Sequence, residues 1–370
     1  MALMHFEGFD PYPDNGAAQF TAVGDFETNS IGSPSAAMFS SSASFAHTGL
    51  KGHREGGLSN NSLEFGDCNR FYTGRTVTGG DTVFMGAYVR RSGTTHLYVS
   101  LSSSAVRRGG IGFGINGSGL PTIVRANVAA PTAVGHVTLW TGAEALPADA
   151  LNGTSGSLWM HFQLKALLQA TATGTVELRI NGVTVASLTD VVTTDFQTRV
   201  FDGWAIGGAA RTLHMDDLWF CDGTGPAPFN DFLGPARVRR VALTGNVSSQ
   251  WTPSTGSDNA ALVNDAPADT ATYVEAAASG NTDLYTVEAL PAGISPLAVR
   301  THVLTKRATA DGLANIRPLI SDGSNEVLGQ ERAVLGDWRH MPQIFETAPD
   351  GGAWTPAKVA GLRVGIRRTA

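Results

Sequence analysis

The clearest pattern of hydrophobic and polar positions lies between residues 157 and 190, where the two kinds alternate. Alternate positions hold Met160, Phe162, Leu164 and Ala166 on one side, and Trp159, His161, Gln163 and Lys165 on the other. A period of two places successive side chains on opposite faces, so this run predicts a half-buried β-strand. Residues 175–180 repeat the pattern, and Asn181-Gly182 separates them from another short run, 183–185. Because Asn and Gly both tolerate a positive φ, the sequence predicts a β-hairpin that turns at these two residues.

Further runs with strand character follow one another at short intervals along the chain. They cover residues 82–91, 96–104, 212–221, 270–278, 282–290, 298–309, 338–347 and 362–368. Clusters of Gly, Asp, Asn and Pro separate the runs, and no helical pattern intervenes, which is typical of antiparallel β-sandwiches. One short helix is expected over 356–362, because Thr355 can cap it and Pro356 suits its first position.

Composition agrees with an all-β chain of two domains. Charged residues make up 16% of the sequence, against roughly 25% in an average soluble protein, and glycine supplies 44 of the 370 residues. A segment rich in Gly and Pro ends near residue 235, where we expect the domain boundary. The prediction is a β-sandwich over residues 1–235, followed by a smaller β-sandwich over residues 236–370.

The sequence excludes or disfavours several classes of protein. No window approaches the roughly 18 consecutive apolar residues that a membrane helix needs, so no membrane insertion is expected. The first residues lack the basic flank and apolar run of a signal peptide, and we therefore expect synthesis in the cytoplasm without export by the usual route. Cys68 and Cys221 are too few for a disulfide framework or a four-ligand zinc site, and two unpaired thiols are expected.

The net charge of −6 is unevenly distributed along the chain. Residues 236–370 hold 13 basic and 13 acidic side chains, which leaves 13 basic and 19 acidic ones in residues 1–235. Neither half has the basic excess of a nucleic-acid-binding protein, so no nucleic-acid partner is expected. Arg363, Arg367 and Arg368 cluster near the C-terminus, where a solvated last strand and a partner-binding patch explain them equally well.

A search for catalytic patterns finds none. The sequence has no Gly-x-Ser-x-Gly elbow, no phosphate-binding Gly-x-x-x-x-Gly-Lys motif and no metalloprotease His-Glu pair. The glycine-rich run 112–117 precedes more strand-like sequence and is interpreted as turn glycines. Glycosidases need two carboxylates on one strand face, and no predicted strand offers such a pair. The sequence therefore predicts a protein that is not an enzyme.

Two groups of residues remain as candidate binding sites. Asp216, Asp217 and Asp222 form an acidic cluster, with Asn230 and Asp231 downstream, whose oxygens could bind calcium. The same residue types also stabilise ordinary turns, and no other cofactor is expected. Six aromatic residues in strand runs could stack on sugars, although packing in a sandwich core is the commoner role. These are Tyr88, Tyr98, Trp140, Trp159, Trp204 and Trp219.

Several short motifs, in their order and spacing, resemble one group of proteins. They are Phe6-Glu7-Gly8-Phe9-Asp10 and the runs 204–208, 215–225, 230–238, 251–254, 273–274, 282–285 and 354–356. Together they resemble tailed-phage virion structural proteins, in which a laminin-G or concanavalin-like jelly roll precedes a second β-domain. The resemblance spans nearly the whole chain. It implies a virion component made in the cytoplasm of a bacterial host, at a tail, fibre, spike or capsid surface.

Three functional interpretations follow. The first is a virion structural protein that contacts other virion proteins and forms a homo-oligomer, with a trimer as the first expectation. The second is an adhesin that binds a host-surface glycan, which requires an exposed aromatic residue beside polar groups in a concave site. The third and most remote is a polysaccharide-cleaving enzyme.

Overall fold

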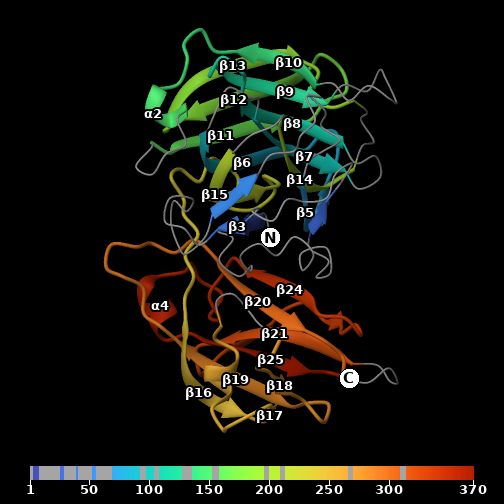
Figure 1. Cartoon of the computed structure of the whole chain (residues 1–370), viewed down its shortest axis with the longest axis vertical. Helices are drawn as coiled ribbons and strands as arrows, with labels where there is room; N and C mark the ends of the chain where they lie inside the picture. The colour runs from blue at the N-terminus through green and yellow to red at the C-terminus, as the bar shows by residue number, and fades with distance from the viewer. Residues whose placement is uncertain are drawn as a thin grey trace. The chain divides into compact units, whose positions relative to one another are not determined.

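The structure is a computed structural model that describes residues 3–7, 26–28, 39–40, 52–55, 69–91, 97–103, 108–126, 136–151, 158–195, 200–208, 213–265, 270–308 and 314–370. Cys68 and residues 8–10 of the opening motif lie outside these ranges. The chain divides into two compact units, the first ending at Arg239 and the second beginning at Arg240 (Figure 1). The described residues contain no helix with the length and hydrophobicity of a membrane span.

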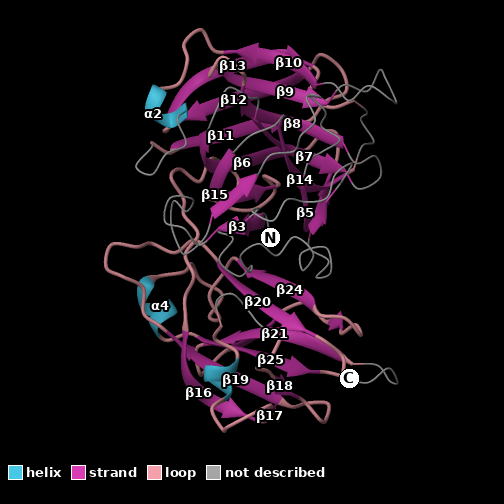
Figure 2. Ribbon diagram, viewed as in Figure 1, coloured by secondary structure: helices cyan, strands magenta, loops and turns pink. Residues whose placement is uncertain are grey.

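Two antiparallel sheets build the first unit (Figure 2). In spatial order, one sheet holds β13 (Val183–Val191), β12 (Gly174–Ile180), β11 (Met160–Leu167), β6 (Thr82–Arg91), β15 (Leu213–Cys221), β4 (Gly52–Glu55) and β3 (Phe39–Ser40), and β1 (Leu3–Glu7) also pairs with β15. The other sheet holds β10 (His136–Thr141), β9 (Pro121–Ala126), β8 (Arg108–Ile115), β7 (Leu97–Ser103), β14 (Phe201–Gly208), β5 (Asn69–Val77) and β2 (Phe26–Thr28). A short helix, α2 (Ala148–Leu151), follows β10.

The inner faces of these two sheets form the core of the first unit. Phe113 of β8 and Phe162 of β11 stack across it, with ring centroids 5.3 Å apart and an interplanar angle of 15°. Apolar side chains that alternate along β8, β11 and β12 surround this pair and are buried, as the period-two pattern predicts. The predicted all-β, concanavalin-like β-sandwich is therefore confirmed for this unit.

The predicted hairpin connects β12 to β13. Asn181 and Gly182 have φ values of 51° and 82°, the left-handed conformation that this turn requires. The turn also bonds to the neighbouring strand β11, because Asn181 N–H donates to the carbonyl of His161 at 2.8 Å. In return, His161 N–H donates to Asn181 Oδ1 at 2.9 Å. Asn181 thus makes the turn and also fixes it to the third strand.

Strand β11 differs from the prediction of a half-buried strand. Its apolar positions face the core as expected, but His161 and Gln163 on the opposite face are only 3% and 1% exposed. Part of the reason is a covering segment, residues 222–239, which follows β15. Gln163 Nε2 donates to the carbonyl of Gly234 in this segment at 3.3 Å.

The covering segment contacts several strands of the same sheet. Phe232 packs edge-on against Phe84 of β6, with ring centroids 5.8 Å apart. The Arg179 guanidinium of β12 lies over the Phe232 ring, 4.0 Å from its centroid. Arg237 lies 5.6 Å from the ring of Tyr88. The predicted boundary near residue 235 falls inside this segment, which packs on the first unit as far as Arg239.

The second unit is a smaller β-sandwich. Its main sheet holds β16 (Leu243–Ser249), β19 (Thr282–Val287), β25 (Arg363–Arg368), β21 (Asn315–Ser321) and β22 (Glu326–Leu328), with β23 (Arg332–Ala333) also on β21. Two ribbons accompany it, β17 (Thr252–Pro253) with β18 (Val274–Glu275), and β20 (Val299–Thr305) with β24 (Arg339–Phe345). The helices are α3 (Asn259–Leu262) and α4 (Pro356–Ala360).

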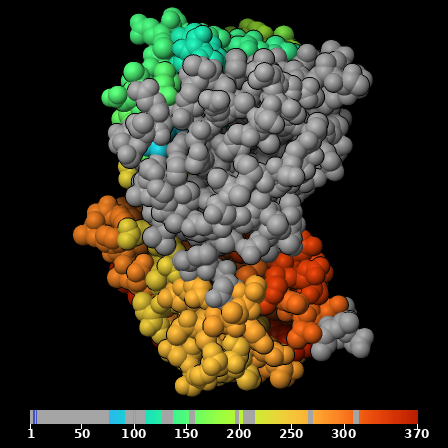
Figure 3. All heavy atoms as spheres, in the orientation of Figure 1, coloured from blue at the N-terminus to red at the C-terminus, as the bar shows by residue number. Residues whose placement is uncertain are grey.

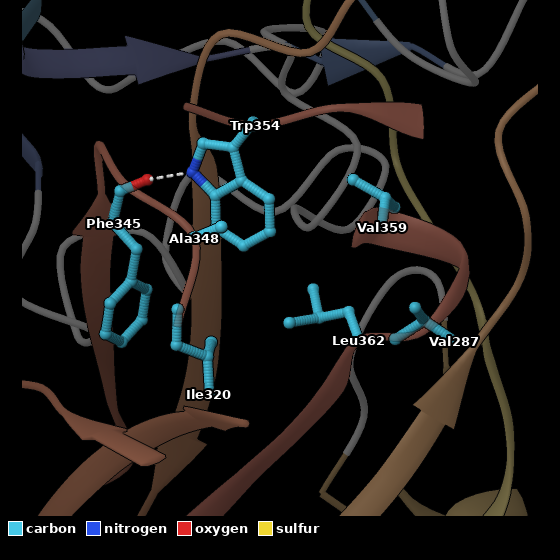
Figure 4. Packing of buried hydrophobic residues seen from close by; sticks show 7 residues of the cluster. All are labelled: Val287, Ile320, Phe345, Ala348, Trp354, Val359 and Leu362. Atoms are coloured by element: carbon cyan, nitrogen blue, oxygen red, sulfur yellow. Dashed lines mark hydrogen bonds between the residues drawn. The ribbon is translucent and has the colours of Figure 1, made fainter. Parts of the chain in front are cut away.

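Side chains from the main sheet and from the β20–β24 ribbon meet in the core of this unit. One cluster consists of Val287, Ile320, Phe345, Ala348, Trp354, Val359 and Leu362 (Figure 4). The indole N–H of Trp354 donates to the carbonyl of Phe345 at 2.9 Å, so the ring is buried with its polar atom satisfied. A second cluster joins Ile316 and Ile366 of the sheet to Met341 of the ribbon.

The predicted helix near the C-terminus is confirmed as α4, which ends at Ala360 and not at residue 362. Thr355 is its N-cap, and the Thr355 side chain accepts a hydrogen bond from Lys358 N–H at 3.2 Å. Pro356 occupies the first helical position, where its missing N–H has no cost. Gly361 caps the other end.

Candidate functional site

The acidic residues predicted as calcium ligands lie in the middle of β15 and just after its end. Asp216 and Asp217 belong to the strand and are fully buried, while Asp222 follows the strand and is 6% exposed. Asp217 has a φ of 52°, at a point where the pairing of β15 with β6 shifts register. Because of this irregularity, the side chains of Asp216 and Asp217 do not follow the regular alternation between the two faces of a strand.

Hydrogen bonds to the protein occupy an oxygen of each of these carboxylates. Asp216 Oδ1 accepts from Asp217 N–H at 2.8 Å, and Asp217 Oδ1 accepts from Val238 N–H at 2.7 Å. Asp222 Oδ1 accepts from both the N–H and the hydroxyl of Thr224, at 3.0 and 2.7 Å. Among the described residues, no group of three His, Cys, Asp or Glu side chains is arranged to hold a metal ion. The geometry favours the turn-stabilising role, and calcium binding stays a prediction.

Chelation tests the calcium hypothesis directly. Because Val238 N–H donates directly to Asp217 Oδ1 and so anchors the covering segment, we expect a calcium chelator to leave the melting temperature within about 2 °C of its original value. Differential scanning calorimetry with and without the chelator measures this. A fall of about 10 °C or more, reversed by added calcium, would establish a structural ion at Asp216, Asp217 and Asp222.

The six aromatic residues singled out from the sequence are not exposed where the structure describes them. Tyr88 and Trp219 are buried, and Trp140 and Trp159 are half-buried. The side chains of Tyr98 and Trp204, in β7 and β14, are outside the described part of the structure. Tyr88 and Trp219 are therefore buried, but they lie beside His161 and Gly86 on the outer face of their sheet and not between the two sheets.

The outer face of the sheet around β6 and β11 concentrates aromatic and cationic groups. Tyr88 and His161 stack with centroids 4.6 Å apart, and the Arg90 guanidinium lies 5.0 Å from a Trp159 ring. However, Tyr88, Arg90 and His161 are 7%, 2% and 3% exposed. A ligand has no access to a face so thoroughly covered, and this cluster is a structural one.

An aromatic pair with one exposed ring lies in the second unit. Tyr273 is 41% exposed and packs edge-to-face with the half-buried Trp338, with ring centroids 6.5 Å apart and an interplanar angle of 62°. Tyr273 directly precedes β18, and Trp338 directly precedes β24, so the pair joins the ends of two separate ribbons. The yellow-orange part of the chain, which carries β17 and β18, lies at the surface of this unit in Figure 3.

Backbone hydrogen bonds fix the position of Tyr273. Ser254 N–H donates to the Tyr273 carbonyl at 2.9 Å, and Tyr273 N–H donates to Ser254 Oγ at 3.0 Å. Beside it, the hydroxyl of Thr272 donates to Asp265 Oδ2 at 3.0 Å on the exposed surface. We call Tyr273 and Trp338, with the polar groups of Asp265 and Thr272, the aromatic surface.

Sequence reasoning missed the aromatic surface. Tyr273 entered the motif comparison only as part of a short run, and Trp338 only as the first residue of an expected strand. Each ring lies just outside a strand, so no alternation of burial identifies it. The sequence does carry one weak indication of this surface, since each ring is an isolated aromatic residue next to the start of a strand.

The three C-terminal arginines are held largely within the second unit. Arg367 forms an ion pair with Glu326 at 2.8 Å, and Nε of Arg367 donates to the hydroxyl of Thr282 at 2.9 Å. Arg368 donates to the carbonyl of Ala276 at 2.8 Å. Their strand, β25, lies between β19 and β21 and is not an edge. These contacts favour a structural role for Arg367 and Arg368 over a partner-binding patch.

No family model and no curated protein matches this sequence. Solved structures resemble it in part. An endo-β-1,4-glucuronan lyase from the fungus Trichoderma reesei has 13% identity and a TM-score of 0.36, over 59% of this chain and 94% of the lyase chain. The carbohydrate-binding module CBM66 from Bacillus subtilis has 9% identity and a TM-score of 0.33, over 53% of this chain and 94% of the module.

A third similar structure is a heptameric pentraxin from Limulus polyphemus. It has 11% identity and a TM-score of 0.30, over 45% of this chain and 72% of the pentraxin. At such identities the likeness concerns the β-sandwich fold, and not the ligand or the activity of this chain. None of the comparisons links the chain to a phage particle.

Proposed function

We propose that this chain is a carbohydrate-binding protein, and that the aromatic surface of the second unit is its binding site. The observation that carries the proposal is the Tyr273–Trp338 pair, near the Asp265–Thr272 hydrogen bond. Tyr273 is 41% exposed and packs against the half-buried Trp338, and an aromatic ring so exposed needs an explanation. Binding of a sugar provides one.

The chemistry of the surface suits a pyranose ring. The C–H groups on one face of a sugar pack against the electron-rich face of an aromatic ring, while the sugar hydroxyls bond to polar groups at the side. The two rings meet edge to face at an angle of 62°. The residue before Tyr273, Thr272, donates its hydroxyl to Asp265 Oδ2, and the carboxylate of Asp265 can accept a further hydrogen bond from a sugar hydroxyl.

We propose that binding occurs without cleavage. The chain offers no catalytic motif at sequence level, and the carboxylates near β15 are engaged in hydrogen bonds that hold the covering segment and a turn. Cleavage is the competing hypothesis, and a polysaccharide panel tests it. Release of reducing ends or of unsaturated products, abolished by one Asp or Glu substitution, would make the chain an enzyme.

The virion setting and the homo-oligomer expected from the sequence resemblance remain predictions. They are compatible with a glycan-binding role, because an adhesin of a particle is repeated in space and gains avidity from weak individual sites. Electron microscopy of a particle labelled with an antibody against this chain tests the setting. Sedimentation at micromolar concentration tests the oligomeric state.

A glycan array followed by calorimetry tests the binding proposal. For a glycan that the full chain binds, we expect Tyr273→Ala and Trp338→Ala each to weaken binding by about tenfold or more, the range of an interface aromatic anchor. Val247→Ala is the matched control, because Val247 is 40% exposed in the same unit, on β16. Circular dichroism verifies folding. Binding that survives both aromatic substitutions would contradict the proposal, as would an array without any bound glycan.

A further inference from the structure

We infer that Ser254 is a positioning residue of the carbohydrate-binding site. It holds the backbone of Tyr273, so that the exposed ring has its binding orientation before a sugar arrives. The inference rests on the proposed function and adds a residue that acts through Tyr273 and not by touching the sugar. It follows from the hydrogen bonds around Tyr273 and from the contact of its ring with Trp338.

Ser254 bonds to both polar groups of the Tyr273 backbone. Ser254 N–H donates to the Tyr273 carbonyl at 2.9 Å, and Tyr273 N–H donates to Ser254 Oγ at 3.0 Å. The relative orientation of the N–H and the carbonyl of one residue depends on its φ and ψ, which are its two soft angles. Two bonds to the same partner residue therefore restrict both backbone angles of Tyr273.

The Ser254 hydroxyl extends a very short ribbon by one residue pair. Strands β17 and β18 pair over two residues each, and one of these, Pro253, has no N–H to donate. At the next pair, Ser254 Oγ accepts the bond from Tyr273 N–H that a strand carbonyl would accept in a regular antiparallel ladder. Removing the hydroxyl leaves Tyr273 N–H without this acceptor.

Two further contacts support the exposed ring. The hydroxyl of Thr272, the residue before Tyr273, donates to Asp265 Oδ2 at 3.0 Å. The Tyr273 ring packs edge-to-face on the half-buried Trp338, with ring centroids 6.5 Å apart. An aromatic side chain that is exposed and already held in place loses less conformational entropy on binding than a mobile one, which favours affinity.

Hydrogen–deuterium exchange of the full chain, without any sugar, tests whether Ser254 holds Tyr273. We expect Ser254→Ala to speed exchange at the Tyr273 amide by about tenfold, because that N–H loses its acceptor. Ser254→Thr keeps a hydroxyl and should restore slow exchange. Ser279→Ala is the matched control, since the Ser279 hydroxyl donates to the carbonyl of Thr369 at 2.8 Å and not to Tyr273. Unchanged exchange in Ser254→Ala would overturn the inference.

The effect on folding is expected to be small, which keeps the binding test clean. Ser254 is exposed, so water can take the place of its hydroxyl at the Tyr273 amide. Ser254→Ala is therefore expected to unfold at nearly the same urea concentration as the natural chain.

Calorimetry with defined hexasaccharides tests the role of Ser254 in binding. The probes are cellohexaose, mannohexaose and the hexamer of N-acetylglucosamine. For the probe that the full chain binds most tightly, we expect Ser254→Ala to weaken binding by about fivefold and Ser254→Thr to restore it. In a chain that already carries Tyr273→Ala, the Ser254→Ala change should cause no further loss, because the ring through which Ser254 acts is absent.

The outcomes separate this inference from the proposed function. An equal loss of affinity with and without the Tyr273 ring would show that Ser254 touches the sugar itself, which overturns the positioning role and leaves a carbohydrate-binding protein. Full affinity in Ser254→Ala overturns the positioning role in the same way. Absence of binding to every saccharide refutes the proposed function, and the role of Ser254 in binding with it.

Discussion

Replacing Asp283 by alanine is expected to lower the free energy of unfolding of the second unit by about 3–5 kcal/mol. Asp283 lies in β19 and is fully buried. Its Oδ1 accepts hydrogen bonds from the N–H groups of Gln250 and Trp251 at 2.6 and 2.8 Å. Its Oδ2 accepts from Asn259 Nδ2 at 2.7 Å and from the Tyr285 hydroxyl at 2.9 Å.

The size of this effect follows from the four donors that the substitution leaves without an acceptor. Each buried donor that loses its partner costs about 1–3 kcal/mol, reduced where water enters the space. Burial raises the pKa of Tyr285 far above its ordinary value, so in the variant the Tyr285 hydroxyl stays protonated and is a donor that has lost its acceptor. The carboxylate therefore ties the turn between β16 and β17, and helix α3, to β19 of the main sheet.

Urea denaturation followed by tryptophan fluorescence measures the change. Asp322→Ala is the matched control, because Asp322 is an exposed carboxylate that also accepts several hydrogen bonds, from Ser324 N–H and from the N–H and side chain of Asn325. Solvent replaces those bonds, so we expect a much smaller loss of unfolding free energy for Asp322→Ala than for Asp283→Ala. Equal losses of unfolding free energy for the two variants would show that the buried hydrogen bonds of Asp283 stabilise the unit no more than the exposed ones of Asp322 do.

Acidification is expected to destabilise the second unit through His340, by about 3 kcal/mol between neutral pH and pH 4. His340 lies in β24, is 6% exposed and stacks on His302 with ring centroids 4.3 Å apart. Burial, and then the charge of Arg300, lower the pKa of His340 from 6.5 to about 4. A group that binds its proton less readily in the folded state favours unfolding as the proton is added.

The direction and the pH window follow from these two pKa values. Above pH 6.5 the imidazole is neutral in both the folded and the unfolded chain, so its titration contributes nothing. As the pH falls from 6.5 to about 4, the unfolded chain takes up the proton first and stability is lost. Below about 4 both states are protonated, and the loss from this group reaches its full value of about 3 kcal/mol.

The variant His340→Phe isolates this contribution, since it keeps an aromatic ring beside His302 and cannot titrate. We expect its unfolding free energy to fall less with acid than that of the natural chain, by about 3 kcal/mol over the window. Carboxylates with lowered pKa values, such as Asp322 and Asp350, titrate equally in both proteins and cancel in the difference. Parallel pH profiles for the two proteins would show that His340 is not buried as the structure has it.

Much of the local structure was predictable because it depends on neighbouring residues only. The alternation over β11 and β12 and the positive φ tolerance of Asn181-Gly182 are properties of short runs, and they fixed the hairpin. Thr355 and Pro356 specified the start of α4 in the same way. Low charge and regularly spaced breakers led to the all-β sandwich class.

What covers each face of a sheet depended instead on segments far away in the sequence. The alternation along β11 predicts that His161 and Gln163 face solvent. They are buried because residues 222–239 return across that face of the sheet, which the sequence of the strand does not reveal. The candidate calcium ligands are close together in the sequence, which predicts a cluster. In the structure the register of β15 is irregular at Asp217, and Asp217 accepts a hydrogen bond from Val238 N–H.

The sequence by itself determined the strands, the tight turns and the class of fold, because backbone conformation and alternation of burial are set within a few residues. Only the tertiary structure decided the candidate site. Tyr273 and Trp338 are 65 positions apart, and their rings meet because the fold of the second unit brings the residues that precede β18 and β24 within side-chain reach. Pairing of that kind arises from long-range packing, which no local pattern encodes.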